Sequence, residues 1–125
     1  MGEFNITVDQ RKNRIILHLT GYQTLDEAQA FKKEYGNAIA KCHRGFTVLT
    51  YAAGYKPGSA EVQKIHADCI KMDAVAGVRK VARVVGETPL GGEQIRRLST
   101  AVREYRAENF KTTAEAEAYL DRESD

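Results

Sequence analysis

The sequence lacks most of the features that would place the protein in a specialised class. Its 125 residues include no run of about 18 apolar residues, so no segment is expected to span a membrane. It has two cysteines, Cys42 and Cys69, which are too few for a disulfide framework. Both lie on expected apolar helix faces, where a reduced cysteine is a small core residue. The first residues lack the basic and apolar regions of a signal peptide, so a cytoplasmic location is expected.

A strong net charge is also missing. The formal charge of +2 is too small to indicate a nucleic-acid partner, and the arginine–aromatic motif of RNA-binding sheets is absent. The charge is unevenly distributed. Residues 1–112 carry 18 basic and 12 acidic side chains, whereas residues 113–125 carry 1 basic and 5 acidic. An acidic final segment of this kind is typical of a solvated helix face. Because the net charge is small and the RNA-binding motif is absent, we expect no binding to nucleic acid.

Motifs for catalysis, metal binding and nucleotide binding are absent as well. The spacing supports no Ser–His–Asp order, no G-x-S-x-G elbow and no carboxylate dyad. His66, Cys69 and Asp73 fall on adjacent turns of one expected helix, but no second Cys or His pair at metal spacing accompanies them. The glycine-bearing loop of residues 86–92 precedes a helix, but Glu93 stands where a P-loop needs Ser or Thr. We therefore expect that the protein is not an enzyme and that it binds neither a metal ion nor a cofactor.

The sequence does contain a regular alternation of strand and helix patterns. Residues 4–8 and 14–20 alternate apolar and polar side chains around a polar turn, which predicts a half-buried hairpin. A capping box that begins at Thr24 opens a helix, and Gly45 is a suitable end for it. The apolar stripe of this helix consists of Ala28, Phe31, Tyr35, Ala38 and Cys42.

The central pattern is a buried strand that leads through a turn into a second helix. Residues 46–51, F-T-V-L-T-Y, form a short apolar run, and the Gly/Pro segment of residues 54–58 interrupts the pattern. Ser59 then opens a helix that Gly77 ends, with a stripe of Val62, Ile65, Cys69, Met72 and Ala76. In α/β sheets, ligands and partners usually meet the chain at the carboxyl ends of strands, which is where this turn lies.

The remaining elements complete a β-β-α-β-α-β-α-β-α order. Residues 78–85 predict a strand, and its three basic residues favour a position nearer an edge of the sheet than its centre. Residues 95–105 predict a third helix and residues 110–111 a short final strand. A second capping box at Thr112 opens the last helix. Residues 1–125 thus predict a single α/β domain with a mixed, mostly parallel sheet and helices packed on it.

Several of these stretches resemble the STAS domain, which sulfate transporters and anti-sigma-factor antagonists share. They are the hairpin start, the strand F-T-V-L-T before a serine-initiated helix, the strand end V-A-R-V-V-G-E-T-P-L-G and the closing T-A-E-A-E-A-Y-L. The resemblance covers most of the chain. It looks nearest to small stand-alone STAS-like proteins related to lipid-binding Sec14-type domains, and it implies a regulatory rather than a catalytic protein.

The resemblance also singles out one hydroxyl. In anti-sigma-factor antagonists the corresponding strand leads to a D-S-S-G or D-S-T-G turn, whose hydroxyl residue is phosphorylated by a partner kinase. By resemblance, Ser59 in P-G-S-A stands in the comparable place, with Lys56 and Gly58 in the same turn. The aspartate and the following glycine of the motif are absent. Ser59 is also a preferred N-cap residue, and this alternative stays open.

Two functional hypotheses follow. The first is a non-catalytic STAS-like regulatory module that binds another protein, such as a kinase or an anti-sigma-like regulator, through residues 56–59 and the helix after them. The second is a carrier or sensor of a small hydrophobic molecule or lipid held between sheet and helices. The residues expected at its pocket or at the strand-end edge are Phe31, Tyr35, Tyr51, Tyr55, Met72, Thr88 and Gly91. Core packing explains the larger of these residues equally well, and a homodimer stays open.

Overall fold

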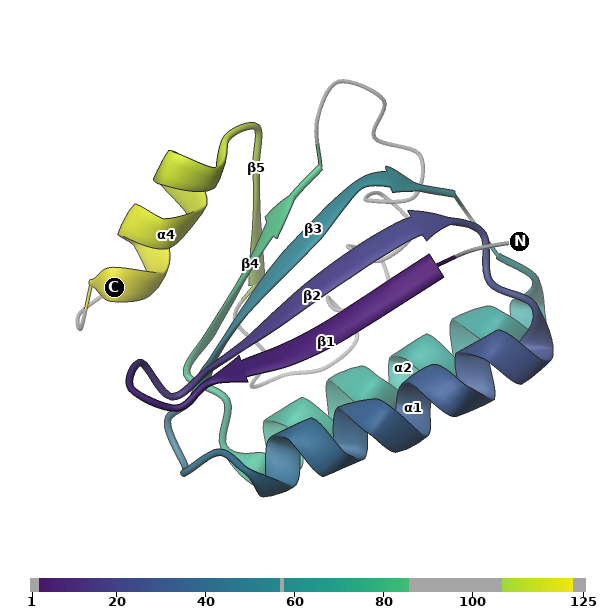
Figure 1. Ribbon diagram of the computed structural model, residues 1–125, viewed down its shortest axis with the longest axis horizontal. Helices are drawn as coiled ribbons and strands as arrows, with labels where there is room; N and C mark the ends of the chain where they lie inside the picture. Colours follow the sequence, from purple (N-terminus) through teal and green to yellow (C-terminus); the bar gives the residue numbers. More distant parts are fainter. Residues whose placement is uncertain (1–2, 57, 86–106, 123–125) are drawn as a thin grey trace.

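A mixed five-stranded sheet forms the centre of the computed structural model, which describes residues 3–56, 58–85 and 107–122. The strand order is β1-β2-β3-β4-β5, with β1 antiparallel to β2 and all other neighbours parallel (Figure 1). The strands are β1 (Glu3–Asp9), β2 (Arg14–Gly21), β3 (Thr47–Tyr55), β4 (Lys80–Val84) and β5 (Ala107–Phe110). The predicted hairpin and the mixed, mostly parallel α/β sheet are therefore confirmed.

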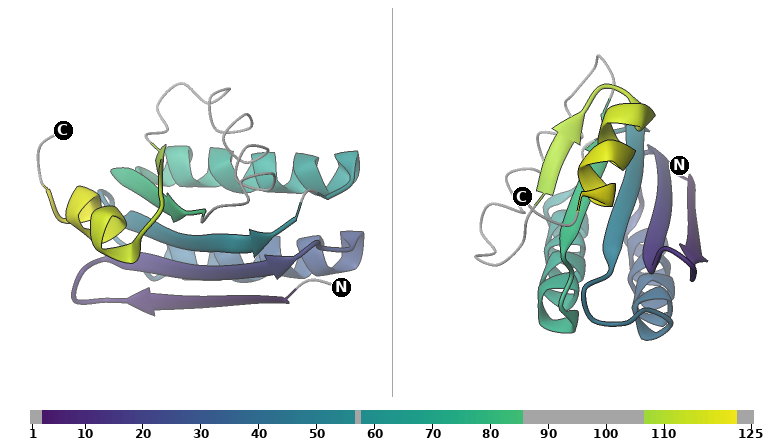
Figure 2. Two further views of the ribbon diagram at one scale, coloured as in Figure 1. Left: turned by 90° about the horizontal axis from the view of Figure 1, so that it is seen from above. Right: turned by 90° about the vertical axis from the view of Figure 1, so that its left-hand side faces the viewer.

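Helices cover both faces of this sheet. α1 (Leu25–Ala40) and α2 (Ala60–Ala76) lie side by side on one face, and α4 (Thr113–Asp121) lies on the other (Figures 1 and 2). Cover on both faces explains why the sequence of β3 shows no regular alternation of apolar and polar side chains. The helix predicted over residues 95–105 and the loop of residues 86–92 lie outside the described residues.

In the described residues, the strands divide their side chains between two hydrophobic cores. Ile15, Val48 and Val81 stand side by side on three neighbouring strands and pack in the core beneath α1 and α2. The residues one position further along β3 and β4 point the other way. They form a smaller core with α4, which consists of Leu49, Ala82, Ala116 and Leu120. Each core removes apolar surface from water, which is the main favourable contribution to folding.

Local sequence signals account for most helix boundaries. The Thr24 Oγ1 accepts from the Glu27 N–H at 3.2 Å and the Glu27 Oε1 accepts from the Thr24 N–H at 2.9 Å, so the predicted capping box is present. α2 ends, as predicted, at Gly77, whose φ of 89° favours glycine. α1 ends earlier than predicted, at Ala40, and Gly45 lies in the turn that follows.

β4 lies one strand in from the β5 edge, and its basic residues have a different explanation from edge exposure. Lys80 and Arg83 are buried. The Lys80 Nζ donates to the carbonyl oxygens of Tyr119 and Arg122, at 3.0 and 2.9 Å, where α4 ends. A cation is favoured there because the helix dipole is negative at its carboxyl end. Lys80 therefore makes polar contacts that hold the end of α4 against the sheet.

Candidate functional site

The turn between β3 and α2 lies at the carboxyl end of the sheet. β3 pairs with β2 as far as Tyr55, which stands opposite Gly21. The Lys56 N–H then donates to the Gly21 carbonyl oxygen at 2.8 Å, which joins the ends of two parallel strands and fixes where the turn begins. The Lys56 side chain is exposed. The turn thus occupies the edge at which open α/β sheets usually bind ligands and partners.

Ser59 is the N-cap of α2. Its Oγ accepts a hydrogen bond from the Val62 N–H at 3.2 Å, and its backbone is extended, with φ −65° and ψ 168°. The residue is exposed. The two interpretations of Ser59 are therefore compatible, because the residue caps the helix and is also exposed. Negative charge here would meet the positive end of a 17-residue helix.

Gly58 is required because the turn comes very close to the helix. A Cβ atom on Gly58 would lie 2.7 Å from the Val62 Cγ1, and Val62 is 1% exposed. The Gly58 carbonyl also accepts from the Gln63 Nε2 at 3.2 Å. Packing and hydrogen bonding together therefore hold this turn against the first turn of α2.

A chain of buried polar side chains connects the end of β3 with α2. The His66 Nδ1 lies 3.1 Å from the Tyr55 hydroxyl oxygen, and the His66 Nε2 lies 2.6 Å from the Gln23 Oε1. Burial lowers the pKa of His66 to about 4 and raises the pKa of Tyr55 to about 12. The imidazole is therefore neutral at pH 7. With one donor and one acceptor, it accepts from Tyr55 and donates to Gln23.

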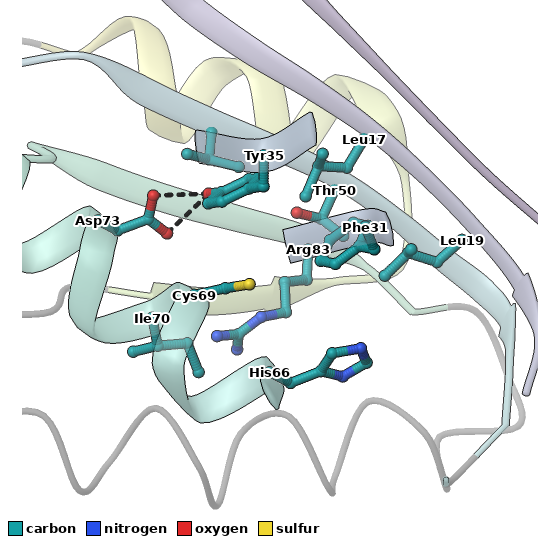
Figure 3. A pocket seen from close by; sticks show the side chains of 11 residues that line it. Leu17, Leu19, Phe31, Tyr35, Thr50, His66, Cys69, Ile70, Asp73 and Arg83 are labelled. Carbon is teal, nitrogen blue, oxygen red and sulfur yellow. Dashed lines mark hydrogen bonds between the residues drawn. The ribbon is translucent and has the colours of Figure 1, made fainter. Parts of the chain in front are cut away.

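A small cavity of about 50 Å³ lies between the sheet and the pair α1–α2 (Figure 3). Tyr35, from α1, places its hydroxyl 2.6 and 2.7 Å from the two carboxylate oxygens of Asp73 on α2. Burial, with the nearby Asp73 charge as a second cause, raises the pKa of the Cys69 thiol to about 12, so the thiol stays protonated and is a poor nucleophile. The polar side chains around the cavity are Tyr35, Thr50, His66, Cys69, Asp73 and Arg83.

The structure brings together only some of the aromatic residues expected at a pocket. Phe31 and Tyr35 both line the cavity, and Tyr55 is buried beside His66. Tyr51 instead points to the α4 face of the sheet, where its ring stacks on the exposed His18 with 4.5 Å between centroids. Tyr51 and Tyr55 therefore do not face one common pocket.

The other expected pocket residues lie elsewhere. Met72 lies against α1, with its Cε 3.4 Å from where a Cβ on Gly36 would be. It lines a groove between the two helices and not the cavity. Thr88 and Gly91 fall outside the described residues.

Buried polar residues are the feature that the sequence interpretation missed. The stripe assigned to α2 ran through Ile65 and Met72, but the helix buries positions 62, 66, 69, 70 and 73. His66 and Asp73 therefore face the sheet. Their signal was the four–three–four spacing 62-66-69-73, which is as regular as the apolar stripe.

The described part of the chain combines an exposed turn at the carboxyl end of the sheet with a polar interior. No three His, Cys, Asp or Glu side chains gather there in a way that could hold a metal ion. None of the helices in this part is both long and apolar enough to cross a membrane. The exposed polar groups of this part of the chain at the carboxyl end of the sheet include Lys56 and Ser59 of the turn.

Comparison with known proteins identifies the fold. No protein-family model matches the sequence, and no curated protein matches it. Among solved structures, an uncharacterized DUF3478-family protein with a SpoIIAA-like fold, from Shewanella loihica PV-4, matches with a TM-score of 0.70. The match covers 96% of this chain and 95% of that chain at 14% sequence identity. The chain has the SpoIIAA-like fold of STAS domains.

Two anti-sigma factor antagonists share this fold. One from Mycobacterium paratuberculosis matches with a TM-score of 0.63 and 13% identity, over 96% of each chain. SpoIIAA in its unphosphorylated form matches with a TM-score of 0.62 and 13% identity, over 94% of this chain and 96% of that chain. At these identities the likeness concerns the fold, and at that level it confirms the STAS resemblance seen in the sequence.

Proposed function

We propose that the protein is a non-catalytic STAS-like regulatory module that binds another protein through the turn of residues 56–59 and the start of α2. The fold supports this role, because two similar structures are anti-sigma factor antagonists, whose name describes action on another protein. The observation that carries the proposal is the placement of Ser59. Ser59 is exposed at the N-terminus of a 17-residue helix, on a turn that the Lys56–Gly21 hydrogen bond fixes at the carboxyl end of the sheet.

This placement suits a phosphorylation switch. A phosphate on Ser59 would add between one and two negative charges, roughly −1.5 to −2 at neutral pH, at the positive end of α2. The helix tolerates that charge, so the fold stays intact. The surface would change strongly, because the neighbouring Lys56 is exposed and the first turn already holds the acidic Glu61. Binding to a partner would therefore change without unfolding.

The alternative function, a carrier of a small hydrophobic molecule or lipid, has weaker support. The cavity between sheet and helices measures about 50 Å³. Pockets for drug-sized molecules measure roughly 300 to 1,000 Å³. A space of this size fits a few water molecules, and several polar side chains that could bind them line it. The cavity therefore favours the protein-binding role as the first proposal.

Affinity capture with Ser59 variants tests the proposal. Tagged wild type, Ser59→Asp and Ser59→Ala serve as bait in extracts of the source cells, with quantitative mass spectrometry as the readout. Thr112→Asp is the matched control, because Thr112 is also an exposed N-cap, with its Oγ1 accepting from the Glu115 N–H at 3.3 Å. We expect at least one protein that wild type and Thr112→Asp capture equally and Ser59→Asp captures several-fold differently. Equal capture by all four baits would show that the turn is not the binding surface.

A further inference from the structure

We propose that a groove between α1 and α2 is a second docking surface, for a short partner helix with apolar anchors flanked by Asp or Glu. The groove has a volume of about 400 Å³ and opens to solvent. Its position along α2 separates it from the turn of residues 56–59. Ser59 and Val75 are 16 residues apart, which is about 24 Å along a helix axis. The lining residues are Gly36, Ile39, Lys71, Met72, Val75 and Ala76.

Gly36 creates the hollow on the α1 side. Because it has no side chain, the thioether end of Met72 reaches the α1 backbone, with Cε 3.4 Å from where a Cβ would be. Ile39, one turn further along α1, provides the next apolar wall. Methionine is unbranched and polarizable, so it adapts to the shape of an incoming side chain. The floor of the groove is thus apolar and deformable.

Val75 makes this surface unusual. It is 81% exposed, more than any other large hydrophobic side chain in the described part of the chain. An exposed valine side chain contributes no burial free energy to folding. Its branched Cβ also restricts the side chain and lowers helix propensity slightly. Scattered exposed apolar residues are ordinary. Val75 is different because Met72, Ile39 and Ala76 join it in one hollow.

The rim of the groove is positively charged. Lys71 lines the groove and is exposed. Toward the N-terminal end of α2, the Lys32 Nζ lies 3.3 Å from the Asp68 Oδ2, so the acidic residue there is already neutralised. Beyond the other end, the Arg44 side chain lies beside Gly77, since a Cβ on that glycine would meet it at 2.5 Å.

Two further carboxylates of these helices face elsewhere. Asp73 is 2% exposed and contacts the Tyr35 hydroxyl in the interior. Glu34 lines a different hollow, between β1 and α1. The positive charge of the groove rim is therefore not offset by these carboxylates.

This charge determines the kind of occupant. A second copy of the chain, docked through the same face, would place the cations of one rim against those of the other, and like charges across an interface are unfavourable. A membrane-surface helix presents a long apolar face, whereas this floor spans about one helical turn. A partner helix with anchors three or four residues apart, flanked by carboxylates, complements both the floor and the rim.

A designed peptide is the probe for this surface. It is helical, with leucines three and four residues apart and glutamates at its other exposed positions; a matched peptide has lysine in place of every glutamate. Methyl NMR of the full chain reports where each peptide binds. We expect the glutamate peptide to shift the methyl signals of Ile39, Met72 and Val75. Its affinity should fall as salt is added, and it should bind Ser59→Asp as tightly as wild type. The lysine peptide should leave these signals in place.

Exposed-site variants complete the test. Val75→Glu and Lys71→Glu should each weaken binding of the glutamate peptide by about tenfold or more. Lys64→Glu is the same charge change on the same helix, seven residues nearer its N-terminus and outside the lining of the groove, and should change affinity less than about twofold. The proposal is overturned if neither peptide shifts the groove methyls, if both peptides bind alike, or if Lys64→Glu acts like Lys71→Glu. Two other results would also overturn it. One is binding to phosphatidylserine vesicles that depends on Val75, with no binding of the peptide. The other is a dimer that Val75→Glu dissociates.

Discussion

The Tyr55 hydroxyl and the His66 Nδ1 lie 3.1 Å apart, and this hydrogen bond links the last residue of β3 to the second turn of α2. The residues between them include the whole turn that carries Ser59. Gln23 extends the same chain of hydrogen bonds toward the start of α1. The position of the turn therefore depends on a histidine that is neutral and buried.

Acid should destabilise the protein through His66. Burial lowers its pKa to about 4 from an ordinary 6.5, so below pH 6.5 the unfolded chain binds a proton that the folded chain does not. The stability present above pH 6.5 is therefore lost progressively as the pH falls to about 4. The full difference corresponds to about 3 kcal/mol as an upper limit. Urea unfolding curves across this pH range measure it.

Histidine variants show whether His66 is the cause. His66→Asn should start from a lower stability, because it disturbs the bonds to Tyr55 and Gln23, but should lose less of it on acidification. His18→Asn is the control, because His18 is exposed on the opposite face of the sheet. An acid dependence that is the same in His66→Asn as in wild type would contradict the assignment.

Ser59 variants should separate capping from signalling. Ser59→Ala removes the acceptor for the Val62 N–H and should cost about 1 kcal/mol of unfolding free energy. Ser59→Asp keeps an acceptor and suits the helix dipole, so its stability should stay within a few tenths of a kcal/mol of wild type, roughly. Chemical denaturation checks both values. A large loss of stability in Ser59→Asp would mean that a charge cannot be placed there without disturbing the fold.

Gly58→Ala should be destabilising because of space. The new Cβ would lie 2.7 Å from the Val62 Cγ1 in a packed region, and overpacking of this kind costs about 1 to 3 kcal/mol. Gly54→Ala is the matched control, because a Cβ there would be 3.5 Å from the Thr20 Cγ2, an ordinary contact. Thermal unfolding of the two variants makes the comparison. If they lose equal stability, close approach to Val62 is not the reason for the glycine.

Tyr35→Phe should weaken the link between α1 and α2. The change removes the hydroxyl that lies 2.6 Å from the Asp73 Oδ1 in the protein interior. Loss of a donor to a buried carboxylate costs about 1 to 3 kcal/mol. A double-mutant cycle with Asp73→Asn measures the coupling between the two residues. A coupling energy near zero would show that the contact contributes little to stability.

Short-range features of this fold were predictable from the sequence. Thr24 with Glu27, and Ser59 before α2, are local signals whose hydrogen-bond partners lie within three residues. The strand at residues 46–51 was also clear, because a strand covered on both faces is a continuous apolar run. The same run did not show which face of the sheet Tyr51 occupies. Without alternating apolar and polar residues, the sequence does not distinguish the two faces of a strand.

The polar interior was harder to predict for a physical reason. Two stripes can be drawn along α2, one through Ile65 and Met72 and the other through His66 and Asp73. They are shifted by one residue, which is about 100° around the helix axis. The apolar stripe was preferred, but His66 and Asp73 face the sheet because their hydrogen-bond partners are there. Those partners, Tyr55, Gln23 and Tyr35, are 11, 43 and 38 residues away, and a single sequence does not reveal such pairings.

Site-specific photo-crosslinking in the source cells would show whether the turn of residues 56–59 contacts another protein. A photoreactive residue replaces Lys56, which is exposed beside Ser59, and Glu115 on α4 serves as the control position. We expect a discrete protein adduct from position 56. Ser59→Asp should change its yield, and position 115 should not form it. No adduct from position 56, or the same adduct from both positions, would contradict the proposed contact.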